Sequence, residues 1–228
     1  MILSSQKSRS NWAVIVAAGS GTRLGGDSPK QFIRLADREL LSFSVDTFLN
    51  HPAIDHVVIV TTAAFLHRVR KSYPACTVVV GGETRQESSA NGVAACQTDA
   101  TKILIHDAAR PFVTPQTISE CLAALDENDA AAPVIPTKDT IVKQEGSTWR
   151  QLDRSQLRAM QTPQGFRAEV IRSAHATGVI GTDEIGLVLA SKPLAQVHLF
   201  EGDLDNFKIT TRQDLELAKL VLARRQTN

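Results

Sequence analysis

Short apolar runs alternate with segments of helical spacing along the first 135 residues. The runs predict strands covered on both faces, at residues 12–17, 57–60, 77–80, 103–105 and 130–135. Apolar side chains at every third or fourth position predict helices between them, at residues 39–49, 63–71, 86–96 and 114–128. The last helix should begin with Thr114 as its N-cap and Pro115 in its first turn. This alternation predicts an α/β fold with a mostly parallel central sheet and helices on both faces.

The alternation stops at Pro136. Residues 140–144 and 148–152 flank a turn that contains Gly146, and they predict a β-hairpin. Such a hairpin is an excursion from a parallel sheet, so residues 137–156 should form a protruding arm of one domain that spans residues 1–228. The remaining pattern predicts two helices and a strand, at residues 167–176, 213–225 and 195–200.

Composition excludes several classes of function. The chain has 228 residues, of which 43% are apolar, so it can bury a sizeable core. Lys and Arg number 25 against 24 Asp and Glu, and this balance argues against binding nucleic acid or an anionic membrane. The longest apolar runs fall short of the roughly 18 residues that a membrane span needs.

The cysteines and histidines suggest no metal or disulfide framework. Cys76, Cys96 and Cys121 are an odd number without a CxxC pair, which fits packing thiols in a reducing compartment. The histidines form no HxxxH or HExxH pair, and His106 is expected near a site without being a ligand. Residues 1–10 are polar and lack an apolar signal core, so we expect a cytoplasmic protein.

A glycine-rich segment, residues 17–30, follows the first predicted strand. A dinucleotide fingerprint would need a third glycine where Leu24 stands, and a P-loop would need lysine where Asp27 stands. A glycine turn without a ligand is the simplest alternative. Arg23 and Lys30 favour a phosphate site instead, because the carboxyl ends of parallel strands bind ligands and Pro29 restrains the Lys30 backbone.

Three motifs carry a resemblance to a known family. They are Ala17-Ala-Gly-x-Gly-x-Arg-Leu-x5-Lys30, Gly81-Gly-Glu-Thr-Arg85-x-x-Ser88 and Ile105-His-Asp107-Ala-Ala-Arg110-Pro111. The first resembles the signature of nucleotidyltransferases, which have a Rossmann-like fold. Together, with further matches in order up to residues 205–208, they resemble the 2-C-methyl-D-erythritol 4-phosphate cytidylyltransferase family of the non-mevalonate isoprenoid pathway.

The resemblance implies a reaction between CTP and 2-C-methyl-D-erythritol 4-phosphate that releases pyrophosphate. Transition-state stabilisation at the α-phosphate is assigned to Arg23 and Lys30, in agreement with the loop argument. Arg154 and Lys208 are expected to position the attacking phosphate. The implied cofactor is Mg²⁺ or another divalent cation, which usually accompanies a triphosphate and prefers oxygen ligands.

The expected binding residues form two sets. The nucleotide set comprises Ala17, Ala18, Gly19, Ser20, Gly21, Gly82, Glu83, Arg85, Ser88, Asp107 and Ala108. The polyol phosphate set comprises Arg110, Thr140, Arg154, Thr162, Thr182, Asp205 and Lys208. Asp107 follows a buried strand and is the candidate metal ligand. Simpler roles stay open: Asp107 can cap a turn, Gly82 can be a plain turn glycine, and each threonine can be structural.

Two other functions remain compatible with the motifs. The same chemistry could act on another polyol phosphate, such as ribitol 5-phosphate. Alternatively, the fold could serve as a nucleotide-sensing module without catalysis. That module would not need Arg23, Lys30, Arg154 and Lys208 together, and all four are present.

The predicted arm also bears on assembly. An isolated two-stranded hairpin is marginally stable in water, and this one carries Ile141, Val142 and Trp149. The simplest cover is the same arm of a second copy across a twofold axis. The resemblance agrees and implies that Thr140 and Arg154 reach the neighbour's site, whereas an arm folded on its own domain is the alternative.

Overall fold

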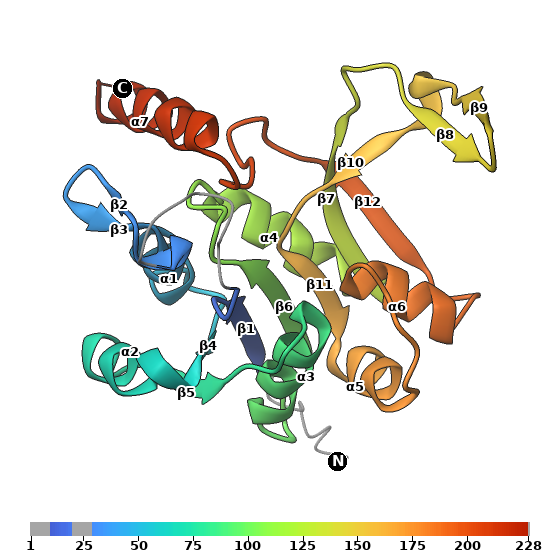
Figure 1. Cartoon of the computed structure of the whole chain (residues 1–228). Helices are drawn as coiled ribbons and strands as arrows, with labels where there is room; N and C mark the ends of the chain where they lie inside the picture. Colours follow the sequence, from blue (N-terminus) through green and yellow to red (C-terminus); the bar gives the residue numbers. More distant parts are fainter. Residues whose placement is uncertain (1–9, 20–28, 228) are drawn as a thin grey trace, which may run out of the picture.

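The computed structural model describes residues 10–19 and 29–227, and it contains an eight-stranded central sheet. Seven strands lie in the order β10-β7-β11-β6-β1-β4-β5, and β12 also pairs with β7. The strands are β1 (Asn11–Val16), β4 (His56–Thr61), β5 (Thr77–Val80), β6 (Lys102–Asp107), β7 (Ala130–Pro136), β10 (Arg158–Met160), β11 (Gln164–Arg167) and β12 (Val197–Glu201). The predicted α/β class is confirmed (Figure 1).

Parallel pairing dominates the half of the sheet where the chain alternates strand and helix. β1 pairs in parallel with both β4 and β6, and β4 pairs in parallel with β5. The strand β11 is antiparallel to both neighbours, β6 and β7. The carboxyl ends of β1, β4, β5 and β6 therefore share one edge, where open α/β sheets bind ligands.

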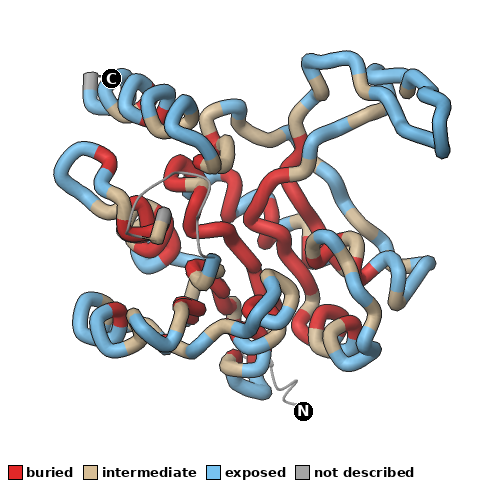
Figure 2. Tube along the Cα trace, viewed as in Figure 1, coloured by how far each residue is buried: buried red, intermediate tan, exposed pale blue. Residues whose placement is uncertain are grey.

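Helices cover both faces of the sheet (Figure 1). They are α1 (Leu40–Leu49), α2 (Leu66–Ser72), α3 (Arg85–Ala95), α4 (Pro115–Ala124), α5 (Ala168–Ala176), α6 (Glu184–Ser191) and α7 (Arg212–Thr227). Short 3₁₀ turns are η2 (Lys30–Phe32), η3 (Ala63–Phe65) and η4 (Arg154–Gln156). Alternate residues of β1 serve two cores: Trp12 and Val14 pack with α3 and α5, while Ala13 and Ile15 pack with α1 and α4. Buried residues accordingly fill the centre of Figure 2.

The helix expected at residues 114–128 begins as predicted and ends early. The Thr114 hydroxyl accepts from the Thr117 N–H, and Pro115 lies in the first turn. The helix ends at Ala124, not near Asn128. The Ala124 carbonyl accepts from the Asn128 N–H at 3.1 Å and from the Asn128 side chain at 2.8 Å, so Asn128 caps the carboxyl end of the helix.

Several elements escaped the sequence pattern. They are β10, β11, α6 and a small hairpin of β2 (Arg34–Leu35) and β3 (Arg38–Glu39). The segment of β11 contains Gly165 and follows Pro163, which are turn signals in sequence. Pairing with β6 and β7 makes it a strand, and a Cβ atom on Gly165 would lie 2.5 Å from the Cys121 sulfur.

The predicted hairpin is present as β8 (Val142–Glu145) and β9 (Thr148–Gln151), which pair only with each other. It projects away from the sheet beyond β7 and β10 (Figure 1), and its surface is exposed along its length (Figure 2). Trp149 is 63% exposed and Val142 is 50% exposed. Within this chain, these apolar side chains therefore lack the burial that the sequence analysis expected them to need.

Two further expectations from the sequence concern disulfides and membrane spans. Cys76, Cys96 and Cys121 are all free thiols, and the last two are buried. None of the described helices is long and apolar enough to cross a membrane.

Helix α3 lies close to the sheet because of Gly92. A Cβ atom there would lie 2.3 Å from Val14 Cγ1 and 2.8 Å from Val60 Cγ2. We expect Gly92→Ala to lower the free energy of unfolding by about 1–3 kcal/mol, since overpacking outweighs alanine's better helix propensity. Urea denaturation measures this change.

The matched control is Ala94→Gly, at an exposed position of the same helix. Propensity alone predicts a loss of about 0.5–1 kcal/mol there. A stabilised Gly92→Ala protein would show that α3 does not depend on this close approach.

Candidate functional site

The carboxyl end of β6 places an ionised carboxylate among three cations. Asp107 Oδ1 lies 3.1 Å from Arg85 Nε, and Oδ2 lies 2.8 Å from Lys208 Nζ and 3.8 Å from Arg110 Nε. The Asp107 side chain is only 9% exposed. Burial alone would raise the pKa of Asp107, but the charges of Arg85, Lys208 and Arg110 hold that pKa well below its usual range. Asp107 therefore stays ionised within the cluster.

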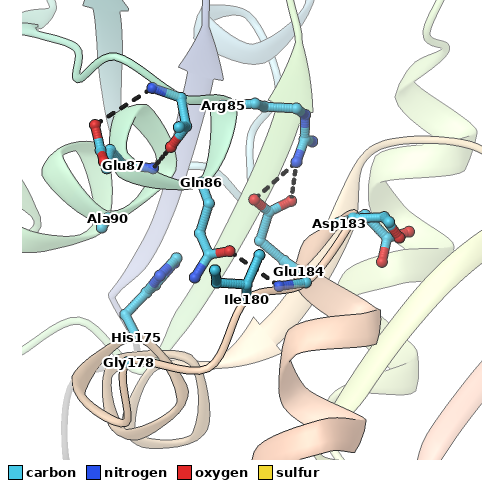
Figure 3. Close-up of a pocket in the computed structure, with 12 residues that line it drawn as sticks. Arg85, Gln86, Glu87, Ala90, His175, Gly178, Ile180, Asp183 and Glu184 are labelled. Carbon is cyan, nitrogen blue, oxygen red and sulfur yellow. Dashed lines mark hydrogen bonds and ion pairs between the residues drawn. The ribbon is translucent and has the colours of Figure 1, made fainter.

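Glu184 supplies a second buried carboxylate. Both of its oxygens accept from Arg85 Nη1, at 2.7 and 2.8 Å, and the residue is 1% exposed. Figure 3 shows the Arg85 guanidinium reaching from α3 to the start of α6, where Glu184 lies. Burial opposes the charge of Arg85, but the two carboxylates raise the pKa of Arg85 above its usual value. Arg85 thus links Glu184 to Asp107.

The local structure around Arg85 is set by the preceding residues. Thr84 and Glu87 form a capping box at the start of α3, in which the Thr84 side chain accepts from the Glu87 N–H. Glu87 in turn accepts from the backbone N–H of Glu83 at 2.7 Å, while the Glu83 side chain is exposed. The box fixes where α3 begins and hence where Arg85 projects.

The expected nucleotide segments meet beside this cluster. A Cβ atom on Gly81 would lie 2.5 Å from Ala18 Cβ and 2.6 Å from Ser88 Oγ, so the three residues are in close contact. The Gly82 N–H donates to Ser88 Oγ at 3.2 Å. The Ala17 N–H donates to the Val60 carbonyl at 2.8 Å. The structure therefore brings the residue after β1 next to the segment that leads into α3.

A second network surrounds Asp107 on the side of β11. Thr162 is buried; its hydroxyl accepts from the Asp107 N–H at 3.1 Å and lies 3.0 Å from His106 Nδ1. Burial lowers the pKa of His106 to about 4, so its ring is neutral at pH 7. Arg110 donates from Nη1 to the Asn206 carbonyl at 2.8 Å. Both side chains expected to bind the polyol phosphate, Thr162 and Arg110, are thus held by internal contacts.

Other predicted residues lie beyond the ion pairs around Asp107 or outside the described residues. Ala108 is buried directly after β6, Gly19 is exposed, and Thr182 is exposed before α6. Asp205 forms ion pairs with Arg224 and Arg225 of α7. The backbone of Lys30 begins η2. Three residues fall outside the described ranges: Ser20, Gly21 and Arg23.

The arm carries the remaining two residues. Thr140 and Arg154 are exposed, and Arg154 Nη1 donates to the Lys138 carbonyl of the same arm at 3.0 Å. Figure 1 shows the arm extending away from the end of β6. The fold of one chain thus separates these two residues from the cluster around Asp107.

The described carboxylates do not make a metal site of their own. Within residues 10–19 and 29–227, no three His, Cys, Asp or Glu side chains are grouped to hold a metal ion. Asp107 is the carboxylate at the sheet edge, and its oxygens face cations. A divalent cation would therefore take most of its oxygen ligands from phosphates and water, as Mg²⁺ commonly does.

A cavity of about 420 Å³ adjoins the Arg85–Glu184 pair (Figure 3). Its lining includes Thr182, which was expected to bind substrate, and His175 from α5. The Gln86 amide closes one wall, since it donates to the Val179 carbonyl and accepts from the Gly181 N–H. Arg85 connects this cavity to the cluster around Asp107.

Three residues of these networks were not assigned a role from sequence. They are Glu184, Gln164 and Asn206. All three lie within segments that matched the family pattern, at residues 162–164, 182–184 and 205–208, and this match was the available signal. Their pairing with Arg85 and Thr162 depends on contacts between distant segments, which a motif does not encode.

Comparison with known proteins identifies the family. Residues 12–224 match the family model of 2-C-methyl-D-erythritol 4-phosphate cytidylyltransferase. The enzyme of that name from Deinococcus radiodurans is 44% identical over 212 residues, covering 91% of this chain and 87% of that protein. A crystal structure of the Thermus thermophilus enzyme is similar, with 33% identity and a TM-score of 0.77 over 92% of this chain and 98% of that one. The 4-diphosphocytidyl-2C-methyl-D-erythritol synthase from Anaerococcus prevotii has a TM-score of 0.84 at 25% identity, covering 94% and 96% of the two chains. The chain therefore belongs to the 2-C-methyl-D-erythritol 4-phosphate cytidylyltransferase family.

Proposed function

We propose that this chain performs its family's reaction at the sheet edge around Asp107. The reaction transfers the cytidylyl group of CTP to 2-C-methyl-D-erythritol 4-phosphate, giving 4-diphosphocytidyl-2-C-methyl-D-erythritol and pyrophosphate. The observation that carries the location is the cluster of Arg85, Arg110 and Lys208 around Asp107, beside the contact of Ala18, Gly81 and Ser88. The family assignment does not favour ribitol 5-phosphate or a non-catalytic sensor.

The chemistry is a displacement at phosphorus. A phosphate oxygen of the polyol phosphate attacks the α-phosphorus of CTP, and the bond to the β-phosphate oxygen breaks as pyrophosphate leaves. The attacking monoester needs no strong base, because its second pKa is ~6 and it is mostly dianionic at neutral pH. The barrier comes from bringing two anions together, so positioning and charge stabilisation must supply the catalysis.

The cluster suits anionic substrates because its charges do not cancel. Three cations, Arg85, Arg110 and Lys208, face two carboxylates, Asp107 and Glu184. One positive charge is left for an incoming phosphate. The carboxylates also hold the cations at fixed places before substrate arrives, which lowers the cost of reorganisation during the reaction. Lys208 and Arg110 are the proposed partners of the polyol phosphate within this chain.

Arg23 and Lys30 are proposed to stabilise the charge that develops on the α-phosphate. Both lie in the sequence segment that follows β1, and β1 ends in register with Asp107 of β6. The loop therefore starts at the edge that holds the cluster. Cations placed where charge develops in a water-poor site contribute more than they would in bulk water.

Base recognition is proposed for the contact between the end of β1 and the start of α3. Ser88 is buried, and its hydroxyl faces the backbone of Gly82. Backbone groups of Ala18 and Gly82, together with this hydroxyl, can match the N4 donor and the O2 and N3 acceptors of cytosine. A Cβ atom on Gly82 would lie 2.3 Å from Glu87 Cβ, so glycine is needed here for the close approach to α3.

Mg²⁺ is proposed to arrive with the CTP phosphates, with Asp107 as its protein ligand. The metal would supply charge neutralisation at the phosphates. Asp107 suits this role because its cationic neighbours keep it ionised in spite of its burial. A single carboxylate is sufficient when substrate phosphates and water provide the other ligands.

The arm is proposed to join two subunits in a cytoplasmic homodimer. It exposes Trp149 and Val142, which a second arm would cover. It also carries Thr140 and Arg154 away from the cluster of its own chain, so these residues are placed to act at the neighbour's site. A twofold contact of this kind completes both sites at once.

Substrate specificity tests the reaction itself. We expect pyrophosphate release to require both CTP and 2-C-methyl-D-erythritol 4-phosphate, and to be strongly reduced with UTP. UTP lacks the N4 donor and would leave buried acceptors unpaired, at a cost of about 1–3 kcal/mol each. A coupled pyrophosphate assay measures these rates.

The controls of that assay are CTP alone and CTP with ribitol 5-phosphate. Equal use of UTP would contradict the proposed base contacts. Faster turnover of ribitol 5-phosphate would contradict the proposed acceptor.

Replacement of the loop cations tests their role in the transition state. Arg23→Ala and Lys30→Ala should each lower kcat about 100-fold or more, as expected for the loss of one preorganised contact to developing charge. Circular dichroism should show an intact fold. The matched control is Arg34→Ala, a nearby exposed cation of β2, which should retain wild-type kcat. Near-normal turnover in either loop variant would remove that residue from the proposed role.

A mixing experiment tests whether the site is shared. Arg154→Ala and Lys30→Ala proteins should each be nearly inactive. If Arg154 acts across the interface, half of the randomly exchanged dimers are mixed and each has one complete site, so roughly a quarter of wild-type activity should return. Subunit exchange is verified with differently tagged chains. No recovery after verified exchange would place both residues in one subunit's site.

A further inference from the structure

Four residues next to the cation cluster form a closed ring of hydrogen bonds through their side chains and backbone carbonyls. His106 Nε2 lies 3.1 Å from the Arg110 carbonyl, and Arg110 Nη1 donates to the Asn206 carbonyl at 2.8 Å. Asn206 Nδ2 donates to the Thr162 carbonyl at 2.8 Å. The Thr162 hydroxyl lies 3.0 Å from His106 Nδ1 and completes the ring.

The direction of each hydrogen bond follows from the groups involved. The Arg110 carbonyl can only accept, so His106 Nε2 must carry the proton. His106 has no exposed surface, and a charged ring there would be costly, so Nδ1 is an acceptor. The Thr162 hydroxyl therefore donates to Nδ1, which leaves its oxygen to accept from the Asp107 N–H at 3.1 Å. The Nε2–H tautomer of His106 therefore fits both of its hydrogen bonds in the ring.

The ring joins three distant segments that carry site residues. Residues 106–110 hold Asp107 and Arg110, residue 162 precedes β11, and residue 206 precedes Lys208 by two positions. The segment after Asn206 is anchored again where the Ile209 N–H donates to the Ala109 carbonyl at 2.8 Å. Lys208 is thus held from both sides while its Nζ contacts Asp107.

We propose that His106 and Asn206 are positioning residues, which act through this ring to place Lys208 and Arg110 for the acceptor phosphate. They touch no reacting atom in this scheme. His106 fixes the backbone of Arg110 and the hydroxyl of Thr162, and Asn206 fixes the backbone that leads into Lys208. Each member depends on the others, so the ring acts as one unit. This proposal rests on the proposed function and adds residues to it.

Kinetics of substituted proteins test the unit. His106→Gln keeps a donor for the Arg110 carbonyl but loses the acceptor for Thr162, and Asn206→Ala loses the donor to the Thr162 carbonyl. Each should lower kcat/KM about tenfold to a hundredfold, because small misplacements of binding groups are costly. The KM for the polyol phosphate should rise, while the KM for CTP stays within about twofold. The double variant should lose no more kcat/KM than the single variant that has the larger loss.

His51→Gln is the matched control. His51 is also buried and also carries its proton on Nε2, since Nδ1 accepts from the Ala53 N–H and Nε2 lies 3.0 Å from Ser119 Oγ. It lies outside the ring, so His51→Gln should lower the melting temperature comparably and leave kcat/KM unchanged. Equal loss of kcat/KM in this control, or additive losses in the double variant, would overturn the proposal.

A spectroscopic measurement on the wild-type protein tests the hydrogen-bond ring even if the variants do not fold. ¹⁵N NMR of the wild-type protein at neutral pH should show His106 as the Nε2–H tautomer. The Nδ1–H tautomer or a protonated ring would overturn the proposal. Because this readout needs no turnover, a failure of the proposed function and a failure of the ring are distinguishable. Wild-type protein that is inactive with CTP and the polyol phosphate would reject the function alone.

Discussion

The site depends on the ionised state of Asp107, a carboxylate buried against Arg85, Lys208 and Arg110. A buried charge is costly unless it is paired, and removal of one partner leaves the others uncompensated. The carboxylate therefore keeps three cations close together, and the cations keep the carboxylate charged. Asp107 thus keeps three mutually repelling cations close together, where they can bind an anionic substrate.

Two supports keep this cluster in place. On one side, the capping box of α3 directs Arg85 toward Glu184, whose burial makes the pair rigid. On the other side, His106 and Thr162 hold the backbone of residues 106–110. The capping box is formed by exposed residues at the start of α3, whereas His106 and Thr162 are buried. The positions of the cations are therefore determined by the packing of the sheet and its helices, which favours preorganised electrostatic catalysis.

The arm follows a different principle. Its strands pair only with each other, and it exposes Trp149 and Val142. The hairpin points away from the sheet of its own chain, so that sheet does not cover it. In the proposed homodimer, the second arm would cover these side chains and Arg154 would act at the neighbour's site.

The sequence by itself determined the alternation of strand and helix, the edge at which β1 and β6 end, and the motifs that contain Ser88, Asp107 and Lys208. Apolar periodicity and glycine placement are local properties, so they can be read along the chain. It did not determine β11, whose turn-like sequence becomes a strand between β6 and β7. It also gave Glu184 no role, because its pairing with Arg85 joins residues 99 positions apart. Only the tertiary structure decided these features, since burial and ion pairing depend on which segments the folded chain brings together.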